Sequence, residues 1–253
     1  MALSKNRIRY IRSLELKKNR KADKVFLAEG PKLVEDLLGR FPCLFLLATA
    51  EWFSHNSSLS VADVTEVSEE ELSRASLLKA PQQVLAVFRQ PDDTWDSSIM
   101  SHSLCLALDD VQDPGNLGTI IRLADWFGIE HIFCSPNTVD AYNPKTVQAT
   151  MGGIARVKLH YTPLPELIES LNDVPVYGTF LNGENIYTLP LSSHGLIVMG
   201  NEGNGIGKEV KELINRRLYI PSYPAERETS ESLNVAIATA VVCAEFRRRG
   251  ASL

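Results

Sequence analysis

Cysteine is scarce in this chain of 253 residues, and its four cysteines are far apart. No CxxC pair occurs, and Cys43, Cys105, Cys134 and Cys243 each stand within an apolar run. Isolated cysteines of this kind favour buried, reduced thiols over disulfides, and they exclude a cysteine-based structural zinc site. We therefore expect a protein of a reducing compartment, with the cytoplasm as the default.

Long hydrophobic runs are also missing. No apolar run reaches the ~18 residues that a membrane-spanning helix needs, and no apolar stretch follows the basic N-terminus. The sequence therefore predicts neither a membrane span nor a signal peptide. With 44% hydrophobic and 23% charged residues, the composition is typical of a globular protein that buries a sizeable core. The length allows one large domain or two smaller ones, and we expect two.

The common catalytic and nucleotide-binding signatures are absent as well. HExxH and GxSxG do not occur, and the five histidines stand alone. The glycine-rich segment 200–208 is no P-loop, because Glu209 follows Lys208, and its glycines are spaced GxGxG rather than GxGxxG. What remains is a glycine-rich turn directly after an apolar strand, which is where open parallel sheets bind ligands.

Charge is distributed unevenly along the chain. The net charge is −5, yet residues 1–24 contain nine of the 26 Lys and Arg residues and only two of the 31 Asp and Glu residues. This basic arm could bind the phosphates of a nucleic acid, or it could be an ordinary solvated helix face. Ile8, Ile11 and Leu14 recur at a spacing of three, which predicts a helix in either case.

The pattern of elements divides the rest of the chain in two. Short strands and helices over 25–90 predict a small α/β domain, in which Ser68 and Glu71 have the spacing of a capping box. The polar stretch 91–100 is the expected linker. Over 101–253, apolar strands alternate with helical stretches, which predicts a parallel sheet covered on both faces. The last helix, apolar in VAIATAVVCA and basic in FRRR, is expected to be buried in a core or at a subunit interface.

Three segments occupy equivalent positions at predicted strand ends: DDVQDPGNLGTIIRLADWFG at 109–128, IVMGNEGNGIG at 197–207 and LYIPSYPAERETSESLNVAIATA at 218–240. In this order and spacing they resemble the three motifs of the SpoU/TrmH-type family of the SPOUT superfamily, the S-adenosylmethionine-dependent RNA ribose 2′-O-methyltransferases. The resemblance covers residues 104–249. The stretch FLAEGPKLVEDLL at 26–38 is similar to the start of the small L30e/L7Ae-like substrate-binding domain that many members carry.

The resemblance implies a trefoil knot in the C-terminal sheet, a rare exception to the rule that chains do not thread loops. It also implies a set of site residues. The implied catalytic residues are Asn116, Arg122, Glu202, Ser232 and Asn234. The implied cofactor pocket consists of Thr179, Leu181, Gly200, Asn201, Ile220, Ser232 and Leu233. The segment 222–231 is longer than the usual connection in the family and lacks its glycine.

Methyl transfer from a sulfonium is an in-line displacement on an electrophile that is already activated. The enzyme must mainly position the reactants and help to deprotonate a weakly acidic ribose hydroxyl, and no metal is implied. Arg122 receives its catalytic role from the resemblance, and a guanidinium suits phosphate binding or alkoxide stabilisation better than proton abstraction.

Each of these residues also has a structural alternative. For Arg122 it is a solvated helix face, which its apolar neighbours in IIRLAD disfavour. For Asn116 the alternative is helix capping, and for Glu202 a loop surface charge. Asp109 and Asp110 are expected to hold the turn that follows their strand.

The expected function is therefore S-adenosylmethionine-dependent 2′-O-ribose methylation of RNA by a homodimer that binds no membrane and no metal. Ribosomal RNA is the expected substrate, because a separate small domain suits recognition of a folded RNA loop. The alternatives are transfer RNA as substrate, methylation of a base or a protein, and a non-catalytic RNA-binding protein that keeps the knot. The apolar C-terminal helix and the family both favour the homodimer.

Overall fold

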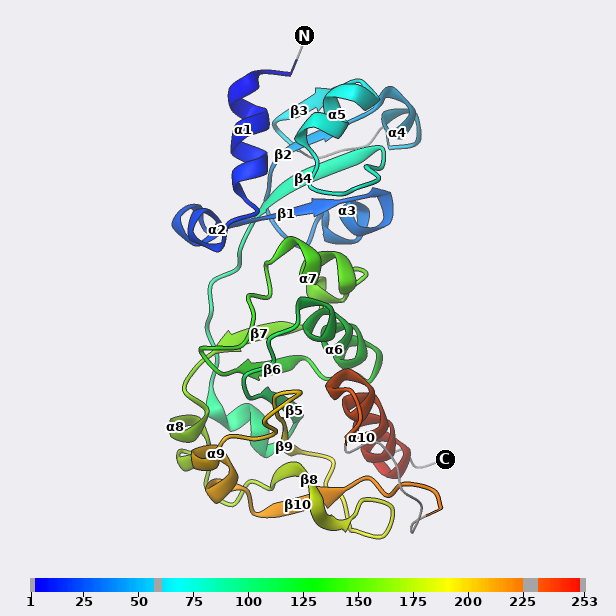
Figure 1. Ribbon diagram of the computed structural model, residues 1–253. Coiled ribbons are helices and arrows are strands. Elements are labelled where there is room, and N and C mark those ends of the chain that lie inside the picture. The colour runs from blue at the N-terminus through cyan, green and yellow to red at the C-terminus, as the bar shows by residue number, and fades with distance from the viewer. Residues whose placement is uncertain (1–2, 57–60, 225–231, 251–253) are drawn as a thin grey trace. The chain divides into compact units, whose positions relative to one another are not determined.

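The computed structural model describes residues 3–56, 61–224 and 232–250, and it divides into two compact units (Figure 1). Unit 1 comprises Met1–Asp92 and Asp140–Ala155, and unit 2 comprises Asp93–Val139 and Arg156–Leu253. The sequence predicts a single change of domain near residues 91–100. The chain instead returns to unit 1 between two strands of the second unit.

The returning segment is attached to unit 1 by polar and aromatic contacts. The buried guanidinium of Arg20 pairs with Asp140 at 2.6 Å, and the ring of Tyr142 lies 5.1 Å from that of Phe26. These contacts join residues more than a hundred positions apart, so no local pattern could have revealed them. The segment contains α7 (Pro144–Ala149) and the short 3-10 helix η2 (Gly153–Ala155).

Unit 1 is built on a four-stranded sheet of order β1-β4-β2-β3, in which only β2 and β3 are parallel. Its helix α5 begins with the predicted capping box: the Ser68 hydroxyl accepts from the Glu71 amide, and the Glu71 carboxylate accepts from the Ser68 amide. The remaining elements are α1 (Lys5–Ser13), α2 (Lys17–Asp23), β1 (Val25–Glu29), α3 (Pro31–Leu37), β2 (Cys43–Ala48), α4 (Ala50–His55), β3 (Val64–Glu66), α5 (Glu69–Ala75) and β4 (Val84–Arg89).

The basic arm forms two helices that belong to the core of unit 1. Ile11 and Leu14 are fully buried, and they pack with Leu27, Leu85 and other residues of the sheet. The predicted spacing of apolar residues is therefore a packing face, while most of the basic side chains of the arm are exposed.

Unit 2 contains a six-stranded sheet of order β10-β8-β9-β5-β6-β7, and every neighbouring pair is parallel. The predicted parallel sheet is therefore confirmed. Strand β9 lies between β5 and β8, so the ends of the strands that precede the first two motifs are adjacent. The elements are η1 (Ser97–Ser101), β5 (Leu104–Leu108), α6 (Pro114–Trp126), β6 (His131–Cys134), β7 (Lys158–Tyr161), α8 (Leu164–Glu169), β8 (Val176–Asn185), β9 (Gly195–Met199), α9 (Lys208–Leu213), β10 (Arg216–Tyr219) and α10 (Val235–Gly250).

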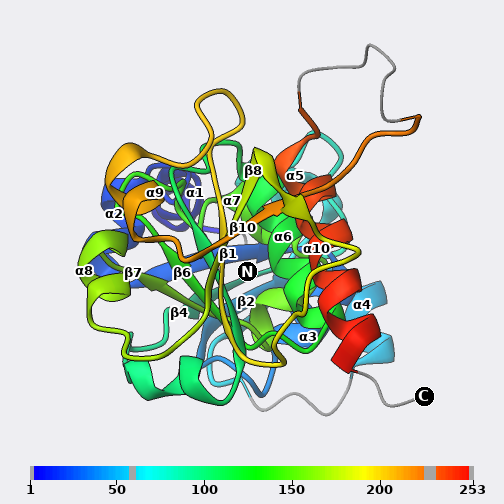
Figure 2. The same ribbon diagram turned by 90° about the horizontal axis from the view of Figure 1, so that it is seen from below.

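Helices cover both faces of this sheet, as the sequence predicts. Figure 2 shows α8 and α9 on one side and α6 and α10 on the other. Because successive side chains of a strand alternate between faces, Cys105 and Ala107 of β5 point toward the cluster that contains Leu167 of α8 and Val210 of α9.

The predicted linker is in large part an element of unit 2. Met100 is fully buried in the core of the unit, and Trp95 packs edge-on against Phe133. Asp93 also accepts a hydrogen bond of 2.5 Å from Nδ1 of the buried His160. Although residues 91–100 are polar in composition, most of this segment is therefore attached to the sheet of unit 2.

Helix α10 is half-buried rather than surrounded. Val235, Val242 and Phe246 face the interior, whereas Ile237 is 55% exposed. The expected burial in a core is therefore observed for one side of the helix, and Ile237 lies on the side that the core does not cover. In the described part of the chain, no helix is long and apolar enough to cross a membrane.

The cysteines are unpaired in the structure. Cys105, Cys134 and Cys243 are buried, and Cys43 is half-buried. Burial raises the pKa of Cys105 and of Cys243 to about 12, so both thiols are protonated at neutral pH.

Candidate active site

The candidate site lies at the carboxyl ends of the neighbouring strands β5 and β9. The ladder between them continues past both strands, because the amide of Asp109 donates to the carbonyl of Met199 at 2.9 Å. Asp109 Oδ2 then accepts from the amide of Gly207 at 2.7 Å. Burial raises the pKa of Asp109, and the nearby Asp110 carboxylate raises it further, while the hydrogen bond from Gly207 opposes both effects. The paired aspartates hold the turn, in agreement with the structural role expected for them.

The glycine-rich loop 200–207 is folded around Asn201. Its side chain donates to the carbonyl of Asp110 at 2.7 Å and accepts from the amides of Gly203 at 2.8 Å and Asn204 at 3.0 Å. Gly200 allows the loop to close, since a Cβ there would lie 2.3 Å from the backbone of Gly205. The side chain of Asn201 is thus used within the protein, and its backbone amide and carbonyl are paired with Gly205 at 2.9 Å each.

Helix α6 carries the first motif and begins at the end of the turn. Asp113 is its N-cap, and the Asp113 carboxylate accepts from the amide of Asn116 at 2.7 Å. Capping was the structural alternative for Asn116, and the structure assigns it to Asp113. The side chain of Asn116 is therefore free to reach the other two motifs.

One hydrogen-bonded chain joins all three motifs. Asn116 Nδ2 donates to Glu202 Oε1 at 2.8 Å, and Asn234 Nδ2 donates to Asn116 Oδ1 at 3.0 Å. Asn234 Oδ1 in turn accepts from the amides of Ala236 at 3.0 Å and Ile237 at 3.3 Å, so Asn234 also caps α10. Three of the five residues predicted to be catalytic are thus in contact, and Glu202 is more than a loop surface charge.

Helices α6 and α10 lie side by side and point in the same direction (Figure 1). Asn116 and Asn234 join their first turns. At the other end, Arg247 of α10 donates to the carbonyl of Phe127 at 2.6 Å and to that of Gly128 at 2.8 Å. The last carbonyls of a helix have no partners within it, so Arg247 satisfies groups that would otherwise need water.

Arg122 is exposed on α6, as are Thr119 and Trp126. Leu117, Ile120, Ile121 and Ala124 are buried at helical spacing, and Arg122 lies outside that stripe. The inference that its apolar neighbours disfavour a solvated position is therefore wrong, because residues next to each other in a helix point in different directions. Among the described residues Arg122 has no ion pair or side-chain hydrogen bond, and its guanidinium is available to a ligand.

A loop-out in strand β8 contains two of the predicted cofactor residues. Arg217 of β10 pairs with Gly178 of β8, whereas the next residue of β10, Leu218, pairs with Glu184 of β8. Residues 179–183 therefore leave the ladder and return to it. They return beside Leu218, where a Cβ on Gly183 would lie 2.5 Å from the backbone. Thr179 and Leu181 lie on this excursion, and Leu181 is 72% exposed.

The third motif supplies exposed groups near the start of α10. Ser232 and Leu233 directly precede the cap Asn234, and Leu233 is 50% exposed. Ile220 follows β10 and is partly buried. Of the unusually long connection 222–231, residues 225–231 lie outside the described part of the chain.

Several site-building residues escaped the sequence prediction. Asp113 has a local signal, since an Asp before Pro is typical of a helix start. Gly183 and Arg247 have none, because their partners are distant in sequence. Among the described residues, no three His, Cys, Asp or Glu side chains gather in a way that could hold a metal ion.

Comparison with known proteins agrees with this geometry. The model of the SpoU rRNA Methylase family matches residues 103–244, and that of the MRM3-like substrate binding domain matches residues 5–86. The chain is 32% identical over 240 residues to the 23S rRNA (guanosine(2553)-2′-O)-methyltransferase RlmP of Bacillus subtilis. The aligned region covers 93% of this chain and 94% of that protein.

Solved structures agree over the full length. A TrmH-family protein from Porphyromonas gingivalis is 41% identical with a TM-score of 0.90, covering 98% of this chain and 100% of that one. An rRNA methyltransferase from Sinorhizobium meliloti, solved with bound S-adenosylmethionine, is 30% identical with a TM-score of 0.85, covering 100% of this chain and 98% of that one. The chain belongs to the SpoU rRNA methylase family. The family predicted from the three motifs, and the substrate-binding domain predicted before them, are confirmed.

Proposed function

We propose that this protein transfers the methyl group of S-adenosylmethionine to a ribose 2′-hydroxyl of ribosomal RNA. The observation that carries the proposal is the chain Glu202–Asn116–Asn234, which joins one polar side chain from each motif. A protein that only bound RNA would have no need for a fixed polar array at the ends of β5 and β9. The names of the relatives support ribosomal RNA over transfer RNA.

The described residues fit the cofactor. Strands β10, β8 and β9 are neighbours, and backbone at Ile220, Thr179 and Gly200 follows their paired portions. Leu181 and Leu233 are large apolar side chains exposed to solvent, and such side chains suit the faces of an adenine ring. When bound, S-adenosylmethionine supplies a methyl group on a sulfonium, an electrophile that needs no further activation.

The protein residues would then act on the ribose. Arg122, exposed and unpaired among the described residues, would bind the neighbouring phosphate and stabilise the negative charge that develops on the 2′-oxygen. Asn116 would hold the Glu202 carboxylate in one orientation through its amide. Ser232 precedes the capped start of α10 and would contribute its hydroxyl at the same place. We also propose that the C-terminal sheet contains the trefoil knot that the family implies.

Unit 1 would bind the RNA outside the reacting nucleotide. Of the basic arm, Arg7 pairs with Asp63, Arg12 donates to the carbonyl of Ser76, and Arg20 pairs with Asp140. The unpaired basic side chains of the described arm include four exposed lysines in and next to α2. At about 3.6 residues per turn, the first three of them fall within a stripe of roughly 100°. The four are Lys17, Lys18, Lys21 and Lys24.

The enzyme would act as a homodimer through α6 and α10. Trp126 at the end of α6 is 83% exposed, and Ile237 on α10 is 55% exposed. Exposed large apolar groups on two adjacent helices favour association with a second copy of the chain. Sedimentation should give a dimer at micromolar concentration, and Trp126→Glu should shift it toward monomer. A wild-type protein that sediments only as monomer would contradict this part of the proposal.

The function is tested by comparing RNA from a deletion strain and its parent. One 2′-O-methylated nucleotide should be missing from the ribosomal RNA of the deletion strain and should return with the wild-type gene. Purified protein with S-adenosylmethionine and unmodified ribosomal RNA should restore the same nucleotide. A missing methyl group on transfer RNA, on a base or on a protein would replace the substrate proposed here. Failure of calorimetry to detect binding of either S-adenosylmethionine or S-adenosylhomocysteine would contradict the cofactor.

A further inference from the structure

The basic end of α10, FRRR, has no role in the function proposed above. A run of three arginines at a chain end could be a nucleic-acid contact. The structure uses two of them differently. Arg247 and Arg249 are turned inward and donate to backbone carbonyls, whereas Arg248, with 64% of its side chain exposed, pairs with Glu245.

The first of these contacts fastens α10 to α6. Arg247 reaches the carbonyls of Phe127 and Gly128, which directly follow α6. The opposite ends of the two helices are joined by Asn116 and Asn234. Two parallel helices held at both ends cannot slide along each other. The contacts at both ends therefore oppose movement of α6, which carries Asn116 and Arg122, along α10.

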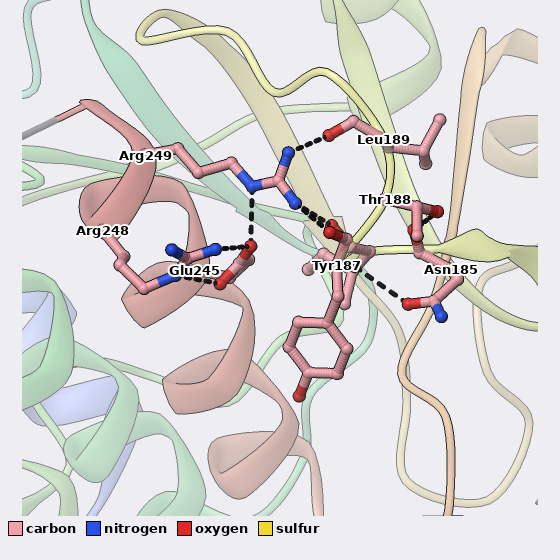
Figure 3. A network of polar contacts seen from close by, with 8 residues as sticks. Asn185, Tyr187, Thr188, Leu189, Glu245, Arg248 and Arg249 are labelled. Carbon is pink, nitrogen blue, oxygen red and sulfur yellow. Dashed lines mark hydrogen bonds and ion pairs between the residues drawn. The ribbon is translucent and has the colours of Figure 1, made fainter.

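The second contact fastens α10 to the loop that follows β8 (Figure 3). Arg249 donates to the carbonyl of Leu189 at 2.6 Å and to that of Tyr187, and its Nε donates to Glu245 at 2.7 Å. Glu245 is buried, and hydrogen bonds from Arg248 and Arg249 lower its pKa to about 2. The guanidinium of Arg249 is thus held by a charged carboxylate on one side and presented to the loop on the other.

This loop begins directly after β8 has rejoined β10 through Glu184 and Asn185. Its turn is fixed by Asn185, whose side chain accepts from the amide of Tyr187 at 2.9 Å. The amide of Ile186 donates to the carbonyl of Tyr219 at 2.9 Å, directly before Ile220. The residues that Arg249 holds are therefore continuous with the far end of the excursion 179–183 and joined to the end of β10.

We propose that Arg247 and Arg249 each hold α10 to another part of unit 2, and that together they position two separate parts of the active site. We call this pair of contacts the clasp. Arg247 positions α6, the helix that carries Asn116 and Arg122. Arg249, together with Glu245, positions the excursion 179–183, which carries Thr179 and Leu181. Both are positioning residues, because neither reaches the motif side chains directly. The inference rests on the proposed function for the identity of the two ligands.

The clasp predicts two different kinetic defects. Arg249→Ala should weaken binding of S-adenosylmethionine, measured by calorimetry, on the order of tenfold, because the charged group that holds several carbonyls is removed. Arg247→Ala should leave that affinity unchanged and lower kcat tenfold to about a hundredfold, the scale expected when reacting groups are slightly misplaced. Amide hydrogen exchange should become faster near 179–189 in the first variant and near 127–129 in the second.

Arg248→Ala is the matched control for the carbonyl contacts, because it removes the other arginine bound to Glu245, from the same turn, and leaves the contacts of Arg247 and Arg249 to carbonyls in place. It should preserve cofactor affinity, kcat and exchange. Arg249→Lys keeps a positive charge near Glu245 but has no planar fork for the carbonyls, so it should remain weak in cofactor binding. Full recovery by lysine would overturn the proposed role of the carbonyls.

The clasp is also overturned if either alanine variant behaves like Arg248→Ala, or if both lower affinity and kcat together in proportion to their loss of thermal stability. A wild-type protein that neither binds S-adenosylmethionine nor methylates ribosomal RNA would contradict the proposed function instead. The exchange measurement needs no ligand, so it tests the two fastenings even in that case.

Discussion

Asn234 and Asn116 are 118 residues apart in the chain, and Nδ2 of Asn234 donates to Oδ1 of Asn116 at 3.0 Å. This hydrogen bond decides the orientation of the Asn116 amide, since its oxygen must face Asn234 and its nitrogen is then directed to Glu202. The amide of Asn116 accepts from one neighbour through its oxygen and donates to the other through its nitrogen. The first motif thus presents Glu202 in a fixed direction only when the third motif is in place.

Asn116→Asp should therefore be more damaging to catalysis than its size suggests. The variant keeps the shape of the side chain but replaces the donor to Glu202 by a second carboxylate, which repels it. We expect kcat to fall about a hundredfold while thermal stability changes little. Asn234→Ser is the matched variant for the other side, because serine still caps α10 but has no amide to donate to Asn116. Wild-type kcat in Asn116→Asp would show that Glu202 needs no fixed orientation.

Arg122→Ala should abolish most turnover without weakening cofactor binding. Removal of one preorganised electrostatic interaction typically costs on the order of 100 to 1,000-fold in rate. Arg122→Lys should not rescue it, because an ammonium lacks the bidentate fork. Since Arg122 is exposed and unpaired among the described residues, its removal should change the free energy of unfolding by less than about 0.5 kcal/mol. If Arg122→Ala methylates RNA at close to the wild-type rate, the residue is an ordinary surface arginine.

Gly183→Ala should destabilise unit 2 and weaken cofactor binding. The added Cβ would meet the backbone of Leu218 at 2.5 Å, so the excursion or β10 must move. We expect a decrease of about 1–3 kcal/mol in the free energy of unfolding, measured with urea. Gly203→Ala is the control, because the nearest atom to its Cβ is 3.6 Å away. Equal stability of the two variants would mean that β10 approaches Gly183 less closely than described.

Acid should destabilise the protein through His131. Its pKa lies below the ordinary 6.5 because of burial, with smaller contributions from the charges of His160 and Lys158 that outweigh Glu130. The unfolded chain takes up this proton near pH 6.5 and the folded chain only at lower pH, so stability decreases as the pH falls through that window. Urea denaturation of wild type and His131→Gln at about pH 7.5 and about pH 5 checks this. The variant should lose less stability on acidification, and an identical loss in both proteins would contradict the assignment.

The α2 lysines should contribute to RNA affinity in a salt-dependent way. Removing Lys17 and Lys21 together should reduce the slope of log affinity against log salt by about 0.7 to 0.9 for each phosphate that is no longer neutralised. Methyl transfer at saturating RNA should be unchanged. A double substitution of Lys32, which pairs with Asp36, and the exposed Lys79 removes the same charge from unit 1. If both double variants shift the slope equally, the effect is one of net charge and not of an α2 surface.

Much of the fold could be predicted because its signals are local. The capping box at Ser68, the strands that become β5 and β9, and each of the three motifs depend on residues that are close together in the chain. Such patterns determine which segments become strands and which polar residues follow them. They also bring Asn116 and Glu202 to one edge of the sheet, because the ends of neighbouring parallel strands meet there.

The sequence by itself therefore determined the family, the parallel sheet and the identity of the candidate site residues. Only the tertiary structure decided that Asn116 joins Glu202 to Asn234, that residues 140–155 join unit 1, and that Arg247 and Arg249 point inward to carbonyls. These outcomes depend largely on interactions between residues far apart in the chain, such as Arg249 with Leu189 and Asn116 with Asn234. Local periodicity cannot specify such interactions, because the sheet order that brings the segments together is a property of the whole chain.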